Sequence, residues 1–454
     1  MPFDQRVRIL PQDDASSGWN EPLPARPPSR SLRGEVRADT AVIGAGFTGL
    51  AIARRLAEVE PDWRIAILEA QRVGSGASGR ASGFVVDLTD FASRMPLEAM
   101  RLYVEVAGSG IADLRRLVRD HDLDCDWDET GWIRAAGGEE GQRFLDAFPS
   151  LYEPLEIDYE RLDRDRMHAI TGTSFYRAGM RLPGYPLVHS AALVRGLAQT
   201  LPKSIELYEE SPVLRIRGGN ASRIQGGSAS PLRGENPFRI ETEHGSVIAD
   251  RILLATNGYT PALGFLPRRI FPLYTFGSFT RPLTDAEQQA LSGDSEWGLL
   301  AMDPMGSTVR RTRDQRILIR NTSFYSRKLR VDRPTRERMR QFHRQAFDQR
   351  FPMLPEAELE YTWAGLMGTS HNGQISFGEL RPGLFVAAGY TAAGIAMGTA
   401  AGRLLAELAA GVDSPHLRFV LDLPKPTWMP PDPFRSLGGW WLNERMNAKA
   451  GPYL

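Results

Sequence analysis

The sequence predicts an α/β fold, in which a domain with a parallel sheet is interleaved with an α+β domain built on a mixed antiparallel sheet. Three observations support this prediction. An apolar run, a glycine-rich turn, an amphipathic stretch and a second apolar run follow one another over residues 37–70. A strand, loop and helix pattern returns over residues 384–410, and the runs at 307–313 and 316–323 indicate adjacent strands.

The first of these segments predicts a βαβ unit. Residues 37–44 and 64–70 are short apolar runs typical of buried strands. Residues 45–60 carry apolar side chains at helical spacing until Pro61 and Asp62 end the pattern. Parallel strands that are joined through a helix belong to open α/β sheets, so this unit begins the parallel domain.

Composition excludes several classes of protein. Over 454 residues, 55 Lys and Arg balance 55 Asp and Glu, so the basic excess of a nucleic-acid binder is missing. Cys125 is the only cysteine, which excludes intrachain disulfides, and with seven scattered histidines we predict no metal site. The N-terminus lacks a signal-peptide core, and the uncharged segment 384–402 is rich in Gly and Ala. We therefore expect a cytoplasmic protein without a transmembrane span.

A glycine pattern lies between the first strand and the first helix. Gly44 permits a tight turn, Gly46 lets the backbone approach a pyrophosphate, and Gly49 lets the helix pack closely on the sheet. Glu69 ends the second strand, 25 residues after Gly44, where an acid binds ribose hydroxyls. The motif therefore predicts FAD or NAD, because an acid at this position disfavours the 2′-phosphate of NADP.

Three further segments have the composition of cofactor-binding loops. The Gly/Ser-rich residues 74–84 suit a second passage along the pyrophosphate, and the apolar strand 252–255 ends in Thr256, Asn257 and Gly258. Gly389 ends a strand, and the stretch from Gly394 opens a long helix whose N-terminus would stabilise an anionic reduced flavin. A pure NAD-binding module would not need this last segment.

These segments resemble the FAD-dependent amine and amino-acid oxidoreductases of the D-amino-acid oxidase superfamily, in the branch with gamma-glutamylputrescine, glycine and sarcosine oxidases. The resemblance covers nearly the whole chain, from the arm at Trp19 to the tail at 430–437. Two stretches depart from the family pattern. Residues 79–83 read Gly-Arg-Ala-Ser-Gly, and residues 371–378 replace the family's Asp-x-x-Pro-x-Ile-Gly stretch, which weakens any substrate inference.

The resemblance implies FAD, held non-covalently because no cysteine lies near the C-terminal motif. The implied FAD contacts are Gly44, Gly46, Phe47, Thr48, Gly49, Glu69, Ala70, Ser78, Gly79, Ser82, Gly83, Val213, Thr256, Gly258, Gly365, Gly389, Gly394, Ile395 and Met397.

Two catalytic candidates also follow from the resemblance. Relatives bind a substrate carboxylate with a strand arginine, and Arg310 matches that place best, with Arg311 as the alternative. Adjacent strand residues face opposite ways, so at most one of them should face the flavin. Tyr259, beside the 256–258 turn, is expected to line the pocket.

The domains are expected to be discontinuous. The predicted segments are an N-terminal arm at 1–34, an FAD-binding Rossmann-like domain at 35–90, 187–262 and 362–420, a substrate domain at 91–186 and 263–361, and a C-terminal tail at 421–454.

The predicted function is oxidation of a C–N bond in an amino acid or amine to an imine. A hydride passes to flavin N5, and the electrons leave to oxygen or another acceptor. The alternatives are a flavin monooxygenase, which Gly389-Tyr390 disfavours because those enzymes usually carry Gly-Asp there, and an FAD-binding subunit of a multi-subunit amine dehydrogenase. The substrate, the acceptor and the oligomeric state do not follow from the sequence.

Overall fold

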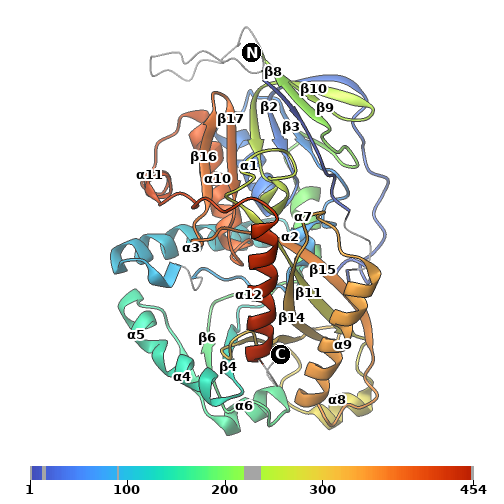
Figure 1. The fold of residues 1–454 in the computed structure, drawn as a ribbon, viewed down its shortest axis with the longest axis vertical. Coiled ribbons are helices and arrows are strands. Elements are labelled where there is room, and N and C mark those ends of the chain that lie inside the picture. Colours follow the sequence, from blue (N-terminus) through green and yellow to red (C-terminus); the bar gives the residue numbers. More distant parts are fainter. Residues whose placement is uncertain (1–2, 13–16, 89–91, 219–236, 451–454) are drawn as a thin grey trace.

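The computed structural model describes residues 3–12, 17–88, 92–218 and 237–450. Within this part of the chain, strands form a nine-stranded sheet and an eight-stranded sheet. Figure 1 shows the first sheet in the upper half of the molecule and the second in the lower half. The fold is thus mixed α/β with two sheets, as the sequence predicts.

The nine-stranded sheet has a parallel centre. Strands β10, β2, β3 and β7 run parallel in that order, and β17 pairs parallel with the far end of β10. Antiparallel strands extend the β10 side, with β9, β8 and β1 beyond β10 and β16 beyond β17, whereas the parallel strand β7 forms the opposite edge. The strands are β1 (Asp4–Arg6), β2 (Gly34–Ile43), β3 (Ile65–Leu68), β7 (Ile205–Tyr208), β8 (Arg215–Gly218), β9 (Phe238–Glu241), β10 (Gly245–Leu254), β16 (Ser376–Arg381) and β17 (Leu384–Ala388).

Helices cover this sheet through small and apolar residues. Leu50, Ile52 and Leu56 of α1 are buried, and the helix ends just before Pro61. A Cβ at Gly402 of α10 would lie 2.4 Å from Thr48 O, so glycine is what lets α10 pack directly on α1. The helices on this side are α1 (Phe47–Val59), α3 (Leu97–Asp120), α7 (Ser190–Gln199), α10 (Ala396–Ala410) and α11 (Pro415–Asp422).

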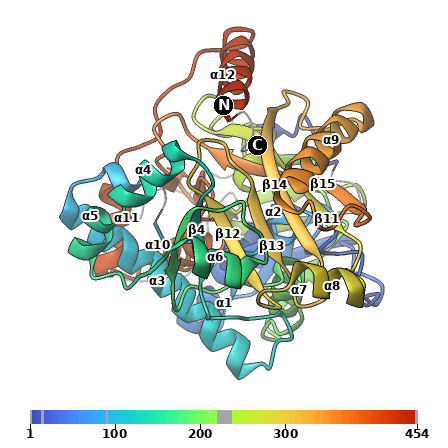
Figure 2. The ribbon, with the colours of Figure 1, turned by 90° about the horizontal axis from the view of Figure 1, so that it is seen from below.

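The eight-stranded sheet runs in the order β15, β11, β14, β13, β12, β4, β6, β5, and Figure 2 shows its central strands side by side. Its pairs are antiparallel except β12 with β4. The strands are β4 (Trp132–Ala136), β5 (Glu160–Leu162), β6 (Ala178–Leu182), β11 (Phe271–Thr280), β12 (Trp297–Ala301), β13 (Thr308–Arg311), β14 (Ile317–Tyr325) and β15 (Leu359–Thr369).

The two faces of this sheet have different neighbours. Trp132 and Met180 join the core that also holds α1 and α10, whereas Ile133 and Val309 pack with Phe347 of α9. One face is therefore turned toward the first sheet. The remaining elements are α2 (Ala77–Arg80), α4 (Glu139–Ala147), α5 (Pro149–Tyr152), α6 (Arg164–Thr171), α8 (Asp285–Leu291), α9 (Arg333–Arg350), α12 (Phe434–Ala450), η1 (Ala92–Arg94), η2 (Glu153–Leu155) and η3 (Asn257–Tyr259).

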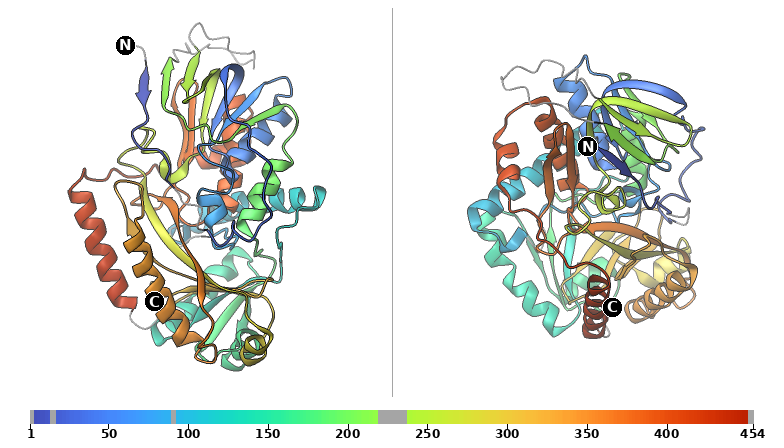
Figure 3. Two further views of the ribbon diagram at one scale, coloured as in Figure 1. Left: turned by 90° about the vertical axis from the view of Figure 1, so that its right-hand side faces the viewer. Right: turned by 45° about the horizontal axis from the view of Figure 1, so that its top comes forward.

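The structure adds detail to three of the expected segments. The expected boundary at 362 falls inside β15, which pairs with β11 in the second sheet. At the start of the N-terminal arm, β1 pairs antiparallel with β8. The tail forms α12, which lies on the outside beside β14 (Figure 3).

Two kinds of feature are absent from the described residues. None of the helices there is long and apolar enough to cross a membrane. No group of three or more His, Cys, Asp or Glu side chains in the same residues is placed to hold a metal ion.

Candidate functional site

The turn between β2 and α1 is shaped to approach a phosphate group. Gly44 has φ +101°, which favours glycine, and a Cβ at Gly49 would lie 1.8 Å from Gly44 O. Gly46 caps α1 without a side chain and the first turn of α1 carries no acid, so the partial positive charge of the helix N-terminus is not neutralised by a carboxylate of that turn. A pyrophosphate fits these features.

Glu69 fixes a carboxylate beside this turn. Its Oε2 accepts from Ala45 N at 2.9 Å and its Oε1 accepts from Gln71 N at 3.1 Å. Burial raises the pKa of Glu69, and these two backbone donors act in the opposite direction. The carboxylate is therefore held at the end of β3, where ribose hydroxyls would bind.

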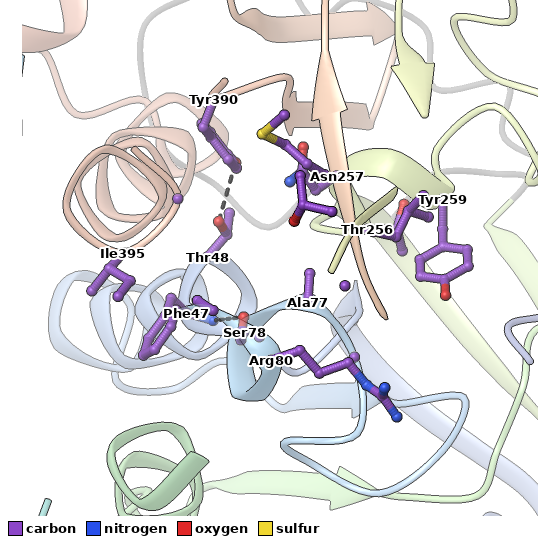
Figure 4. Close-up of a pocket in the computed structure, with 18 of the residues that line it drawn as sticks. Phe47, Thr48, Ala77, Ser78, Arg80, Thr256, Asn257, Tyr259, Tyr390 and Ile395 are labelled. Atoms are coloured by element: carbon purple, nitrogen blue, oxygen red, sulfur yellow. Dashed lines mark hydrogen bonds between the residues drawn. The ribbon is translucent and has the colours of Figure 1, made fainter. Parts of the chain in front are cut away.

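The loop after β3 returns to the same turn. Ser78 Oγ accepts from Phe47 N at 3.2 Å, which ties α2 to the first turn of α1 (Figure 4). A Cβ at Gly79 would lie 2.1 Å from Gly74 O, and one at Gly83 would lie 2.2 Å from Val188 O. These two glycines allow close backbone packing.

Two further segments, the turn after β10 and the loop after β17, pack beside the N-terminus of α1. Asn257 Oδ1 accepts from Gly389 N at 2.9 Å, which joins the end of β10 to the end of β17. Thr48 Oγ1 donates to Tyr390 OH at 3.1 Å, and Figure 4 shows both among the side chains that line one pocket. Four segments far apart in the sequence therefore converge.

A cavity of about 510 Å³ connects this region with the second sheet. That volume lies within the usual range for ligand and cofactor sites. Its far part is lined by residues of β4, β11, β12, β13 and β14, and by Met305 and Gly306. Both sheets thus share one cavity.

Most of the expected FAD contacts line this cavity. They are Gly44, Gly46, Phe47, Thr48, Glu69, Ala70, Ser78, Ser82, Val213, Thr256, Gly365, Gly394 and Ile395, with Tyr259 beside them. The residues that are not in the lining are Gly49, Gly79, Gly83, Gly258, Gly389 and Met397.

Arg310 and Arg311 do not line the cavity. Arg310 is 1% exposed, donates from Nη1 to Val188 O at 2.6 Å and lies over the Trp19 ring. Burial lowers the pKa of Arg310 to about 10, and Asp126 and Glu296 partly offset this. Arg311 donates to Ser292 O and Asp294 O on the other face. The structure therefore places Arg310 as an internal packing residue.

Among the arginines of β13 and β14, Arg320 is the one in the cavity lining. It lines the cavity, and its Nη2 donates to Thr308 Oγ1 at 2.9 Å on the neighbouring strand. Its Nε is buried without an acceptor among the described residues. Burial lowers the pKa of Arg320, and no acid offsets this effect. The alternation of side chains along β13 and β14 could have predicted that Arg310 and Arg320 share one face of the sheet. It could not have predicted which of the two reaches the cavity.

The N-terminal arm contributes a second unexpected part of the lining. Val7, Ile9, Leu10 and Pro11 border the cavity. Arg8 N donates to Ala262 O at 3.2 Å, which holds the arm beside the segment after η3. The sequence offered no periodic pattern in this arm from which the contact could be predicted.

A family model described as "FAD dependent oxidoreductase", the DAO family, matches residues 39–408. The chain belongs to this family. It is thus an FAD-dependent oxidoreductase, and FAD is its cofactor.

Relatives in the DAO family extend over nearly the whole chain. "Probable oxidoreductase OrdL" of Rhizobium meliloti is 27% identical over 92% of this chain and 94% of the relative. The "Gamma-glutamylputrescine oxidoreductase" of Escherichia coli is 25% identical over 85% of this chain and 86% of its own. The crystal structure of glycine oxidase from Geobacillus kaustophilus has a TM-score of 0.66 at 24% identity, covering 84% and 96% of the two chains. This last likeness supports the DAO fold.

The cavity of this DAO-family chain fits FAD. A Cβ at Gly394, just ahead of α10, would meet nothing within 4 Å, so the helix N-terminus opens on free space. Glu69 and the turn after β2 lie at the other end, and their geometry fits a ribose and a pyrophosphate. Cys125 does not line the cavity, and burial raises the pKa of its thiol to about 12.

Proposed function

We propose that this protein oxidises a C–N bond of an amino acid or amine to an imine, which water then hydrolyses. FAD, when bound, takes up the hydride from the substrate carbon, and the amine proton leaves to solvent. One observation carries the proposal: a single cavity is lined by the dinucleotide-binding turns and by the inner face of the second sheet. Relatives named as gamma-glutamylputrescine oxidoreductase and glycine oxidase support this reaction class.

The chain's own residues orient the substrate. Arg320 lines the cavity, and its buried Nε lacks an acceptor among the described residues. A guanidinium binds a carboxylate in two parallel hydrogen bonds, so Arg320 suits the carboxylate of an amino acid. Tyr259 lines the same cavity and would border the substrate.

Several parts of the sequence-based prediction stay predictions. FAD is proposed to bind without a covalent link to cysteine, because Cys125 lies outside the cavity. A cytoplasmic location, the discontinuous FAD-binding and substrate domains and the expected FAD contacts are proposed in the same way, and the electrons are proposed to leave to oxygen or another acceptor.

The test is an anaerobic titration of the FAD-loaded protein with pooled amines and amino acids. The flavin absorption should bleach with at least one pool, and its subdivision would identify the substrate. Reoxidation of the bleached protein by oxygen, compared with artificial acceptors, would identify the acceptor. Flavin bands that no pool bleaches would reject the amine oxidation and favour a monooxygenase.

A second candidate is an FAD-binding subunit of a larger amine dehydrogenase. Phe434, Leu437 and Trp441 of α12 are 68%, 60% and 55% exposed, which is unusual for large apolar side chains. Light scattering of the active protein distinguishes the two candidates. Full activity from one or two identical chains would reject the subunit.

A further inference from the structure

Two arginines mark the ends of a row across the inner face of the second sheet. Arg134 pairs with Leu300 between β4 and β12, and Thr308 pairs with Arg320 between β13 and β14. Leu299 pairs with Val309, so Leu300 and Thr308 follow as the next opposed residues. Directly opposed residues share a face, which puts all four side chains on the same side of the sheet.

All four residues of this row line the cavity. Adjacent strands lie about 4.8 Å apart, so three spacings put the Cα atoms of Arg134 and Arg320 about 14 Å from each other. Leu300 and Thr308 form a short apolar and hydroxyl floor between them. The row therefore carries a cation at each end and no charge in the middle.

The outer cation, Arg134, is held in place without a direct carboxylate partner in the part of the chain that the structure describes. Its Nε donates to Tyr152 OH at 2.6 Å, and its guanidinium lies 4.3 Å from the centre of the Phe148 ring. Its two terminal nitrogens make no hydrogen bond or ion pair among the described residues, and neither is enclosed. Arg134 is thus oriented by its neighbours with two donors left for a ligand.

The carboxylates near the row accept hydrogen bonds from groups other than the two arginines. Asp303 lines the cavity, but its oxygens accept from Gly137 N at 2.7 Å, Gly138 N at 2.9 Å and Gly141 N at 3.2 Å. Asp87 accepts from Tyr185 OH at 2.7 Å and makes no direct ion pair with Arg134. Burial raises the pKa of Asp87, and the nearby charge of Arg134 acts in the opposite direction. The substrate part of the cavity therefore keeps two cations that no carboxylate of the described residues contacts directly.

We propose that Arg134 forms a second anion-binding subsite, and that the substrate is an amino compound with two acidic groups. One carboxylate binds Arg320 and Thr308, and the second, at the far end of the substrate, binds the terminal nitrogens of Arg134. The identification of this ligand as the substrate rests on the proposed oxidation. The subsite itself rests on the row of side chains.

Ligand binding tests the subsite without turnover. The probes are linear dicarboxylates from succinate to pimelate and their monoamides, which keep the shape but lose one charge. Binding to the FAD-loaded protein is followed through the perturbation of the flavin absorption at constant ionic strength. At least one dicarboxylate should bind about 10- to 100-fold more tightly than its monoamide, as charge-assisted hydrogen bonds allow.

Variants assign the two charges to the two arginines. Arg134→Met should abolish the preference while leaving monoamide affinity unchanged, and Arg134→Lys should retain part of it. Arg320→Met should weaken both ligands. Arg181→Met is the matched control, because Arg181 pairs with Ile133 and so lies on the other face of the same sheet. It should change neither affinity.

The outcomes separate this inference from the proposed function. A wild-type protein that binds each dicarboxylate no better than its monoamide overturns the second subsite, even if amino acids bleach the flavin. This comparison requires no variant, so it holds if Arg134→Met fails to fold. A clear dicarboxylate preference with no bleaching by any amine supports the subsite and rejects the oxidation.

Discussion

Thr48 donates a hydrogen bond of 3.1 Å to the hydroxyl of Tyr390, 342 positions away in the chain. Thr48 lies in the first turn of α1, and Tyr390 lies in the loop ahead of α10. Both side chains are buried, and both border the cavity. This contact fixes the two helix N-termini relative to each other at the FAD site.

Tyr390→Phe should weaken FAD binding without changing the fold. The phenylalanine keeps the ring but leaves the buried Thr48 hydroxyl without its partner, a cost of about 1 kcal/mol or roughly fivefold in affinity. Fluorescence of released flavin measures the dissociation constant. Tyr159→Phe is the control, since its hydroxyl bonds Glu153 at 2.8 Å on the surface. Equal FAD affinity in the Tyr390→Phe variant and the wild type would show that the contact does not support the site.

Gly394→Val should produce a folded protein that does not retain FAD. A Cβ at Gly394 meets no protein atom within 4 Å, so the two extra methyl groups would project into the space at the head of α10. Gly108 of α3 also has open space around its Cβ position but lies outside the cavity. Gly108→Ala should therefore keep FAD and gain slightly in stability, because alanine favours helix. Absorption spectra and circular dichroism of the two variants check both expectations, and a yellow Gly394→Val protein would contradict the first.

The parts of the site that sequence analysis predicted obey local rules. Gly44 and Gly49 are required by one turn and one helix contact, and the position of Glu69 follows from the length of a βαβ unit. No local sequence motif predicts the positions of Arg320 and Arg134. They lie in one row only because of the register of four strands, and that register cannot be predicted from any single segment.

Sequence analysis also could not predict which of Arg310 and Arg320 reaches the cavity. Arg310 and Thr308 are two residues apart on β13, so both side chains lie on the inner face. Arg310 is instead covered by Trp19 and the backbone around Gly83, which come from distant parts of the chain. Strand alternation predicted the face, but the packing of those segments decided which arginine reaches the cavity.

Two buried histidines should make the protein lose stability as the pH falls. Burial lowers the pKa of His343 to about 3 and that of His189 to about 4. In the unfolded chain both take up a proton near pH 6.5, whereas in the folded protein they remain neutral. Their stabilising effect is therefore complete above pH 6.5 and is lost below it, by up to about 1.4 kcal/mol per pH unit for each histidine.

Thermal unfolding between pH 7.5 and 5.0 measures this loss. His343→Gln removes one titrating group and can still bond Ser278, whose Oγ lies 2.7 Å from His343 Nδ1. The variant should show a shallower decline of its midpoint with pH than the wild type. His121→Gln, at an exposed position, should follow the wild type. Parallel curves for His343→Gln and the wild type would show that His343 does not drive the decline.

Arg310→Met should lower stability without changing carboxylate binding, and Arg320→Met should lower carboxylate binding without lowering stability. Arg310 bonds Val188 O at 2.6 Å and offsets the charges of Asp126 and Glu296, so its loss should cost about 2 kcal/mol of stability. Arg320 is a buried cation without an acid beside it, and its replacement by an apolar side chain should leave stability unchanged or raise it. Carboxylate affinity should fall only for Arg320→Met. Denaturant unfolding and ligand titration of the same two preparations measure both quantities. A loss of carboxylate affinity in Arg310→Met at unchanged stability would return the substrate-binding role to Arg310.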